Sequence, residues 1–75
     1  LTLQDCFDEH TDVEGYPPDQ AITICTLDHD IDGEILVFLT VDECIAYVDA
    51  ELTVDSATDA EIEAGCEDYI NQGGN

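Results

Sequence analysis

The chain contains no lysine and no arginine, and this absence constrains its fold more than any other feature. Twenty Asp and Glu residues in a chain of 75 give a formal net charge of −20 at pH 7. Self-repulsion at this charge density opposes compaction, and no Lys or Arg side chain can neutralise a carboxylate. A folded form therefore needs another source of stability, such as disulfide bonds, a bound cation, high salt or a basic partner.

The apolar residues indicate a folded domain rather than a disordered acidic tail. They make up 44% of the chain, and the acidic residues are spread along the whole sequence. A chain of this length forms one domain, but it buries only about 60% of the surface that it exposes when unfolded. We therefore expect residues 1–75 to form a single disulfide-stabilised acidic domain.

The charge also excludes classes of partner. Without a cationic side chain the protein has nothing to place against the phosphates of a nucleic acid or of an anionic membrane surface. The longest apolar run, Ile35 to Leu39, is too short for membrane insertion, which takes about 20 residues. The sequence begins with Leu1 and contains no Met, as expected of a processed, secreted, extracellular form.

The cysteines predict two disulfide bonds formed in an oxidising compartment. They are Cys6, Cys25, Cys44 and Cys66, and no two of them form a Cys-x-x-Cys pair. Each bond would contribute roughly 3 to 4 kcal/mol on the chain-entropy model. The sequence allows three pairings, of which we slightly favour Cys6–Cys66 with Cys25–Cys44.

The two ends of the chain predict helices. Thr2 can cap a first helix whose buried stripe ends at His10, and the segment Glu14-Gly15-Tyr16-Pro17-Pro18 then interrupts it. A capping box, Thr58-x-x-Glu61, opens the last helix, which should end at Gly73-Gly74. The predicted buried residues are Leu3, Cys6 and Phe7 in the first helix and Ile62, Cys66, Tyr69 and Ile70 in the last.

The middle of the chain leaves two fold classes open. Pro18-Asp19-Gln20 looks like a helix start, yet residues 21–27 are rich in β-branched side chains. Residues 34–52 could form one long helix, or a strand followed by a helix that starts at the capping box Thr40-x-x-Glu43. The helical face expected there is Val37, Val41, Cys44, Ile45, Val48 and Leu52.

We favour a mainly α fold, a small disulfide-stapled bundle of three to four helices. The alternative is an α+β fold with a hairpin formed by residues 21–27 and 34–41.

Two patterns are candidate metal sites. Asp28-x-Asp30-x-Asp32-Gly33 matches the first half of a calcium loop, but Leu39 stands where such loops supply a bidentate Glu. This predicts a weak calcium site at most, and a solvated acidic turn is the favoured interpretation. No other cofactor is expected.

The second pattern consists of two Cys-x3-His pairs. Cys6 with His10 and Cys25 with His29 could together form a Cys2His2 zinc site. Two disulfides with two surface histidines are preferred, because structural zinc sites usually also carry a short Cys-x2-4-Cys knuckle.

Catalysis has little support in the sequence, and we expect no enzyme. Ser56 is the single serine and precedes a predicted helix, and the negative field disfavours a reactive thiolate. A chain this short also cannot readily enclose a substrate pocket of several hundred cubic ångströms.

The chain resembles the water-borne protein pheromones of Euplotes ciliates. The resemblance covers the whole chain and lies in its acidity, its even number of cysteines and its helical segments with a cysteine each, such as Ala64-Gly65-Cys66-Glu67-Asp68-Tyr69, with Cys6 and Cys44 on other core faces. It implies a disulfide-bonded helical bundle that binds a cell-surface receptor. The chain departs from the family pattern in having fewer cysteines in a longer sequence.

We therefore expect a secreted acidic signalling protein, pheromone-like, that binds a protein receptor with a basic surface. The candidate contact residues are Tyr16, Pro17, Asp28, Asp30 and Asp32. A homodimer is also compatible with the sequence. The alternative function is a calcium- or mineral-associated acidic extracellular protein, and a third interpretation is adaptation to high salt.

Overall fold

The structure, a computed structural model, describes residues 1–28, 30–53 and 55–72. These residues form a mainly helical bundle, as the favoured prediction expected, with one minimal hairpin. In chain order the elements are α1 (Leu3–Asp8), the π-helical turn η1 (Glu9–Val13), α2 (Pro18–Asp28), β1 (Asp30–Ile31), β2 (Glu34–Ile35), α3 (Val41–Glu51) and α4 (Asp59–Asn71).

The first helix begins where the sequence predicted. The Thr2 hydroxyl group accepts a hydrogen bond from the Asp5 N–H at 3.1 Å, and the Thr2 N–H donates to the Asp5 carboxylate at 3.2 Å. This capping box satisfies two amide groups at the start of α1, and the helix continues directly into η1. The Tyr16 N–H then donates to the His10 carbonyl oxygen at 2.9 Å and turns the chain towards α2.

Residues 21–27 lie within α2, so the alternative in which they form a strand is wrong. The helix begins at Pro18, where proline's fixed φ and missing N–H cost nothing. The β-branched residues are accommodated by side-chain hydrogen bonds. Thr26 Oγ1 donates to the carbonyl oxygen of Ile22 at 2.8 Å, and Thr23 Oγ1 donates to that of Gly65 in α4 at 2.9 Å.

A short hairpin follows α2 and replaces the predicted one. Strand β1 pairs antiparallel with β2 in the register Asp30 with Ile35 and Ile31 with Glu34. The turn residues Asp32 and Gly33 have φ values of 52° and 84°, which the favoured two-residue hairpin turns require. Segment 34–41 thus contributes only two residues to a strand, and its partner is not segment 21–27.

Helix α3 is the shorter of the two helices considered for residues 34–52. Its N-cap is Thr40, whose hydroxyl group accepts from the Glu43 N–H at 3.2 Å. The Glu43 carboxylate accepts a hydrogen bond from the Leu39 N–H at 3.0 Å, one residue before the expected Thr40. The sequence predicted that Val37 lies on the buried face of this helix. Because the helix starts at Val41, Val37 lies before it and is 64% exposed, so this part of the prediction is wrong.

Helix α4 follows the second predicted capping box. The Thr58 hydroxyl group accepts from the Glu61 N–H, and the Glu61 carboxylate accepts from the Thr58 N–H. The expected face of Ile62, Cys66 and Tyr69 is buried, and Ile70 is half-buried. The helix ends at Asn71, and the expected stop at Gly73-Gly74 lies outside the described residues.

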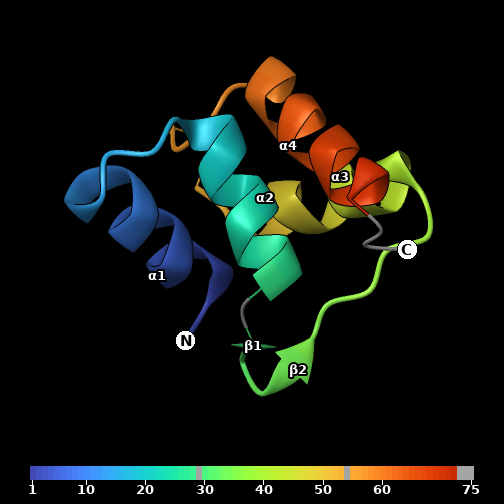
Figure 1. Ribbon diagram of the computed structural model, residues 1–75, viewed down its shortest axis with the longest axis horizontal. Helices are drawn as coiled ribbons and strands as arrows, with labels where there is room; N and C mark the ends of the chain where they lie inside the picture. Colours follow the sequence, from blue (N-terminus) through green and yellow to red (C-terminus); the bar gives the residue numbers. More distant parts are fainter. Residues whose placement is uncertain (29, 54, 73–75) are drawn as a thin grey trace.

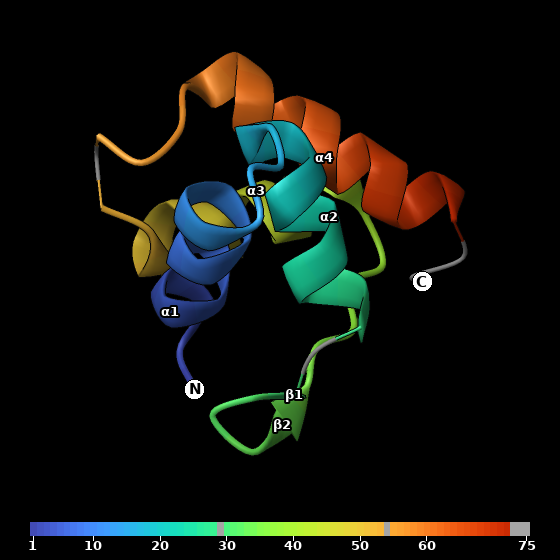
Figure 2. The same ribbon diagram turned by 60° about the vertical axis from the view of Figure 1, so that its left-hand side comes forward.

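Helix α2 lies in the middle of the bundle, with α1 on one side and α4 on the other (Figure 1). Figure 2 shows that α3 lies behind α1 and α2, and that the hairpin projects away from the helices at one end.

The expected disulfide pairing is wrong. The structure joins Cys6 to Cys25 and Cys44 to Cys66, so each bond links two successive helices, α1 to α2 and α3 to α4. Helix α1 packs mainly on α2, whereas α4 packs on α2 and α3. A bond between Cys6 and Cys66 would need α1 to lie against α4.

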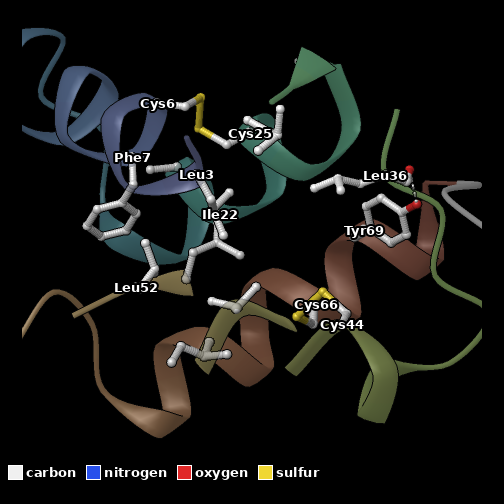
Figure 3. Packing of buried hydrophobic residues seen from close by; sticks show 14 of the residues in the cluster. Leu3, Cys6, Phe7, Ile22, Cys25, Leu36, Cys44, Leu52, Cys66 and Tyr69 are labelled. Atoms are coloured by element: carbon white, nitrogen blue, oxygen red, sulfur yellow. Dashed lines mark hydrogen bonds between the residues drawn. A yellow bond between two sulfur atoms is a disulfide. The ribbon is translucent and has the colours of Figure 1, made fainter. Parts of the chain in front are cut away.

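One continuous core lies between the helices and holds both disulfides at separate points (Figure 3). Its hydrophobic members are Leu3, Cys6, Phe7, Ala21, Ile22, Cys25, Ile31, Leu36, Phe38, Cys44, Val48, Leu52, Ile62, Cys66 and Tyr69. The carboxylates whose side chains the structure describes stay outside it, all exposed except the half-buried Asp19 and Glu61.

Candidate functional site

The predicted contact residues do not form one cluster. Tyr16 and Pro17 precede the first residue of α2, and Asp32 lies in the hairpin turn beyond its last residue. The 11 residues of α2 span about 16 Å, so the two groups lie at opposite ends of this helix (Figure 1). Tyr16 is partly exposed, at 36%, and its ring centroid lies 6.0 Å from that of His10.

The predicted calcium ligands occupy three different elements. Asp28 is the last residue of α2, Asp30 is the first of β1, and Asp32 lies in the turn. The Asp32 side chain is exposed, and its N–H donates to the Leu1 carbonyl oxygen at 2.8 Å. The side chains of Asp28 and Asp30, and residue His29, lie outside the described part of the chain. The calcium site therefore stays a prediction.

An exposed apolar pair, which the sequence interpretation missed, follows the hairpin. Along the extended segment 36–39, Leu36 and Phe38 are buried, whereas Val37 is 64% and Leu39 is 70% exposed. The run from Ile35 to Leu39 is apolar at every position, so its periodicity could not show which side chains face the core.

The Tyr69 hydroxyl group holds this segment in place from α4. It accepts a hydrogen bond from the Phe38 N–H at 3.2 Å and donates one to the Leu36 carbonyl oxygen at 3.1 Å. Figure 3 shows the phenol directed at Leu36. The Phe38 ring packs edge-on against Tyr69, with the centroids 5.3 Å apart. These contacts turn Leu36 and Phe38 inward, and the alternation of an extended chain then places Val37 and Leu39 outside.

Carboxylates surround the exposed apolar pair along the chain. Exposed Glu34 precedes it, and exposed Asp42 and Glu43 follow it at the start of α3. We give the name hairpin face to six exposed residues of the stretch that runs from the hairpin turn to the start of α3: Asp32, Glu34, Val37, Leu39, Asp42 and Glu43.

Helix α3 lies close to this face through Tyr47. The Tyr47 ring packs on Phe38 with centroids 5.4 Å apart. Burial raises the pKa of the Tyr47 phenol, and the carboxylates of Glu51, Asp32 and Glu34 raise it further. Asp32 and Glu34 of the hairpin thus lie close enough to α3 to contribute to the raised pKa of Tyr47.

His10 lies beside the Cys6–Cys25 disulfide rather than on the surface, where the favoured prediction placed it. It is 6% exposed, and its Nδ1 is 3.6 Å from Sγ of Cys6 and 3.7 Å from Sγ of Cys25. The Nδ1–H donates to the Cys6 carbonyl oxygen at 2.8 Å, and Nε2 is 3.7 Å from the Glu14 carboxylate.

Two hollows lined by described residues are small. One of about 280 Å³ lies between α2 and α4, and one of about 130 Å³ lies between α3 and the start of α4. Ligand pockets usually measure about 300–1,000 Å³. The Ser56 hydroxyl group is engaged with the side chains of Gln4 and Thr53. Neither hollow joins this serine to the buried histidine.

No protein-family model matches this chain, and comparisons with curated proteins and with solved structures find no match either. Within the described residues, no helix combines the length and the apolar character needed to cross a bilayer.

Proposed function

We propose that this protein is a secreted, non-catalytic signalling or recognition protein that binds a cell-surface receptor through the hairpin face, in the manner of the water-borne pheromones that it resembles. The observation that carries the proposal is the exposure of Val37 and Leu39 between carboxylates on a segment fixed to the core. The hydrogen bonds from the buried Tyr69 hydroxyl group hold the main chain of this segment, so both side chains are presented at a fixed place on the surface.

The composition of the hairpin face predicts the chemistry of the receptor surface that would bind it. Protein interfaces have an apolar centre and a charged or polar rim. Here Val37 and Leu39 would form the centre, and Asp32, Glu34 and Asp42 the rim. A receptor patch with apolar side chains surrounded by Lys or Arg complements both parts.

A second copy of the chain is a poor occupant of this face. Each copy has a charge of −20 and no Lys or Arg, so two hairpin faces would bring like charges together. The proposed partner is therefore a different protein, and its basic patch would attract the acidic chain over distances of about a Debye length.

The test measures binding of the protein to intact cells of its source organism. The chain is labelled at its C-terminal end, because Leu1 is bonded to the hairpin turn and a label there would disturb the hairpin face. We expect saturable binding that weakens as salt is raised, because the rim charges are screened.

The Val37→Ser/Leu39→Ser double variant should bind at least about tenfold more weakly, since each buried apolar side chain contributes about 1.5–3 kcal/mol. Val13→Ser is the matched control, because Val13 is 78% exposed and lies in η1, which packs on α1 and α2. Binding that is insensitive to salt, or a double variant that binds like the Val13 control, would refute the proposal.

A further inference from the structure

The two disulfides differ in their surroundings. His10 Nδ1 lies 3.6 and 3.7 Å from the two sulfur atoms of the Cys6–Cys25 bond. These three potential ligand atoms all lie within 4.8 Å of one another, and all three residues are buried. Among the described residues this is the one such group of three Cys, His, Asp or Glu side chains, so the Cys44–Cys66 bond has no equivalent.

The helices bring the three residues together. Cys6 and His10 are four residues apart, so they share one face of the continuous helix formed by α1 and η1. Cys25 reaches the same point from α2, and the residues Cys6, His10 and Cys25 are only 2%, 6% and 0% exposed. The group therefore bridges two helices in a dry environment.

We propose that Cys6, Cys25 and His10 bind a zinc ion when their disulfide is reduced, so that α1 and α2 are cross-linked either by a disulfide or by a metal. Zinc binds thiolate sulfur at about 2.3 Å and imidazole nitrogen at about 2.0–2.1 Å in a tetrahedral arrangement. The nitrogen-to-sulfur separation in such a site is about 3.6 Å. Both separations in the structure, 3.6 and 3.7 Å, already have this value.

Reduction changes mainly the distance between the two sulfur atoms, which separate to about 3.8 Å in a tetrahedral site. A phosphine reductant and a water molecule convert the disulfide into two thiols and the phosphine oxide. Zinc then displaces one proton from each thiol, and two thiolates balance its two positive charges. The negative field of a chain with a charge of −20 favours entry of a cation. Water or a further side chain completes the coordination.

Glu14 fits the outer part of this site. A histidine that binds zinc usually donates its other ring N–H to a carboxylate, a backbone carbonyl oxygen or water, and this hydrogen bond fixes the orientation of the ring. When Nδ1 of His10 binds the metal, its hydrogen bond to the Cys6 carbonyl is given up and the ring proton is carried by Nε2. The Glu14 carboxylate lies 3.7 Å from Nε2, and its side chain is 44% exposed and can rotate closer.

The first test uses the whole wild-type chain, fully reduced with a phosphine and supplied with one equivalent of zinc. Alkylation followed by mass spectrometry should show protection of Cys6 and Cys25 and free reaction of Cys44 and Cys66. A reduced chain that has unfolded and holds zinc at random would protect all four cysteines alike. Equal protection of all four, protection of none, or preferential protection of Cys44 and Cys66 would each overturn the proposal.

The second test identifies the ligands. Cobalt in place of zinc should give thiolate-to-metal charge-transfer absorption, which carboxylate ligands do not produce. Glu14→Gln should weaken zinc binding about 10- to 100-fold, as expected for the loss of a carboxylate behind a ligating histidine. Glu9→Gln is the matched control, because Glu9 is an exposed carboxylate in the same turn. Absence of the charge-transfer band, or equal zinc affinities of the two variants, would overturn the assignment.

Discussion

Replacement of Tyr69 by Phe tests the anchor of the hairpin face directly. The variant keeps the buried ring and removes only the hydroxyl group, which bonds Phe38 N–H at 3.2 Å and Leu36 C=O at 3.1 Å. Leaving a buried polar group without a partner costs about 1–3 kcal/mol. Both hydrogen bonds are buried, so each main-chain group left without its partner should cost at least about 1 kcal/mol.

We therefore expect Tyr69→Phe to lower the free energy of unfolding by about 2 kcal/mol. For a domain of this size each kcal/mol corresponds to about 4–8 °C, so Tm should fall by about 8–16 °C. Thermal unfolding followed by circular dichroism measures this change. Amide hydrogen exchange should show faster exchange of the Phe38 N–H, and binding to receptor-bearing cells should weaken because the exposed pair is no longer held in place.

Tyr47→Phe is the matched control for this prediction. Its ring also packs on Phe38, at 5.4 Å between centroids, but its hydroxyl group makes no hydrogen bond to a described residue. Its removal should change stability by less than about 0.5 kcal/mol. If Tyr69→Phe were as mild as Tyr47→Phe, and if Phe38 exchanged at an unchanged rate, the Tyr69 hydroxyl group would not hold the segment.

Three further predictions concern packing, pH and salt. Gly65→Ala should lower the free energy of unfolding by about 1–2 kcal/mol, because the new Cβ would lie 2.7 Å from the Asp19 carbonyl oxygen and 2.8 Å from Ile22 Cβ. Helix propensity alone would raise the stability. Denaturant unfolding measures the change, and a higher denaturant midpoint than that of the wild type would contradict the prediction. Because the pKa of Tyr47 is raised in the folded protein, the contribution of Tyr47 to stability is complete below pH 10.0, the ordinary pKa, and is lost as the pH rises through the higher folded pKa. Glu51→Gln should lower the Tyr47 pKa, which tyrosinate absorbance measures. An unchanged pKa would contradict the role given to the Glu51 carboxylate. Sodium chloride should raise Tm because it screens the repulsion between the carboxylates. Calcium and magnesium at equal ionic strength should raise Tm equally. A rise that is specific to calcium and that Asp32→Asn removes would favour the calcium-associated function instead.

Local signals along the sequence predicted most helix starts correctly. Thr2, Pro18 and Thr58 each mark a helix start because the reason is local: a side chain or a missing N–H satisfies the first turn. For residues 21–27 the β-branched side chains favoured a strand while Pro18 favoured a helix, so local signals did not decide between the two. In the structure these residues are helical, and Thr23 donates a hydrogen bond to the Gly65 carbonyl oxygen, 42 residues away, a tertiary contact that no local sequence pattern indicates.

The disulfide pairing and the hairpin face could not be read from the sequence for related reasons. All cysteines are in segments of similar apolar character, so the choice between partners depends on which helices are neighbours. Val37 looked like part of a helical stripe because its spacing to Val41 and Cys44 fits one turn of a helix after another. In the structure Val37 lies in an extended segment, where the Tyr69 hydroxyl group makes hydrogen bonds to the main chain on both sides of it.

The disulfides and the packing between the helices together support the binding face that we propose for this acidic chain. Each bond closes a helical hairpin over a short sequence separation, 19 or 22 residues, and contributes about 3 kcal/mol on the chain-entropy model. Neither bond joins the α1–α2 pair to the α3–α4 pair. The union of the two pairs depends mainly on the packing of α2 against α4, with the close approach at Gly65 and the hydrogen bond from Thr23 to the Gly65 carbonyl oxygen. Tyr69 lies in that same helix α4, and its hydroxyl group carries the hairpin face. Loosening the contact between α2 and α4 should therefore loosen the hairpin face and weaken the proposed receptor binding, even when both disulfides are intact and no residue of that face is replaced.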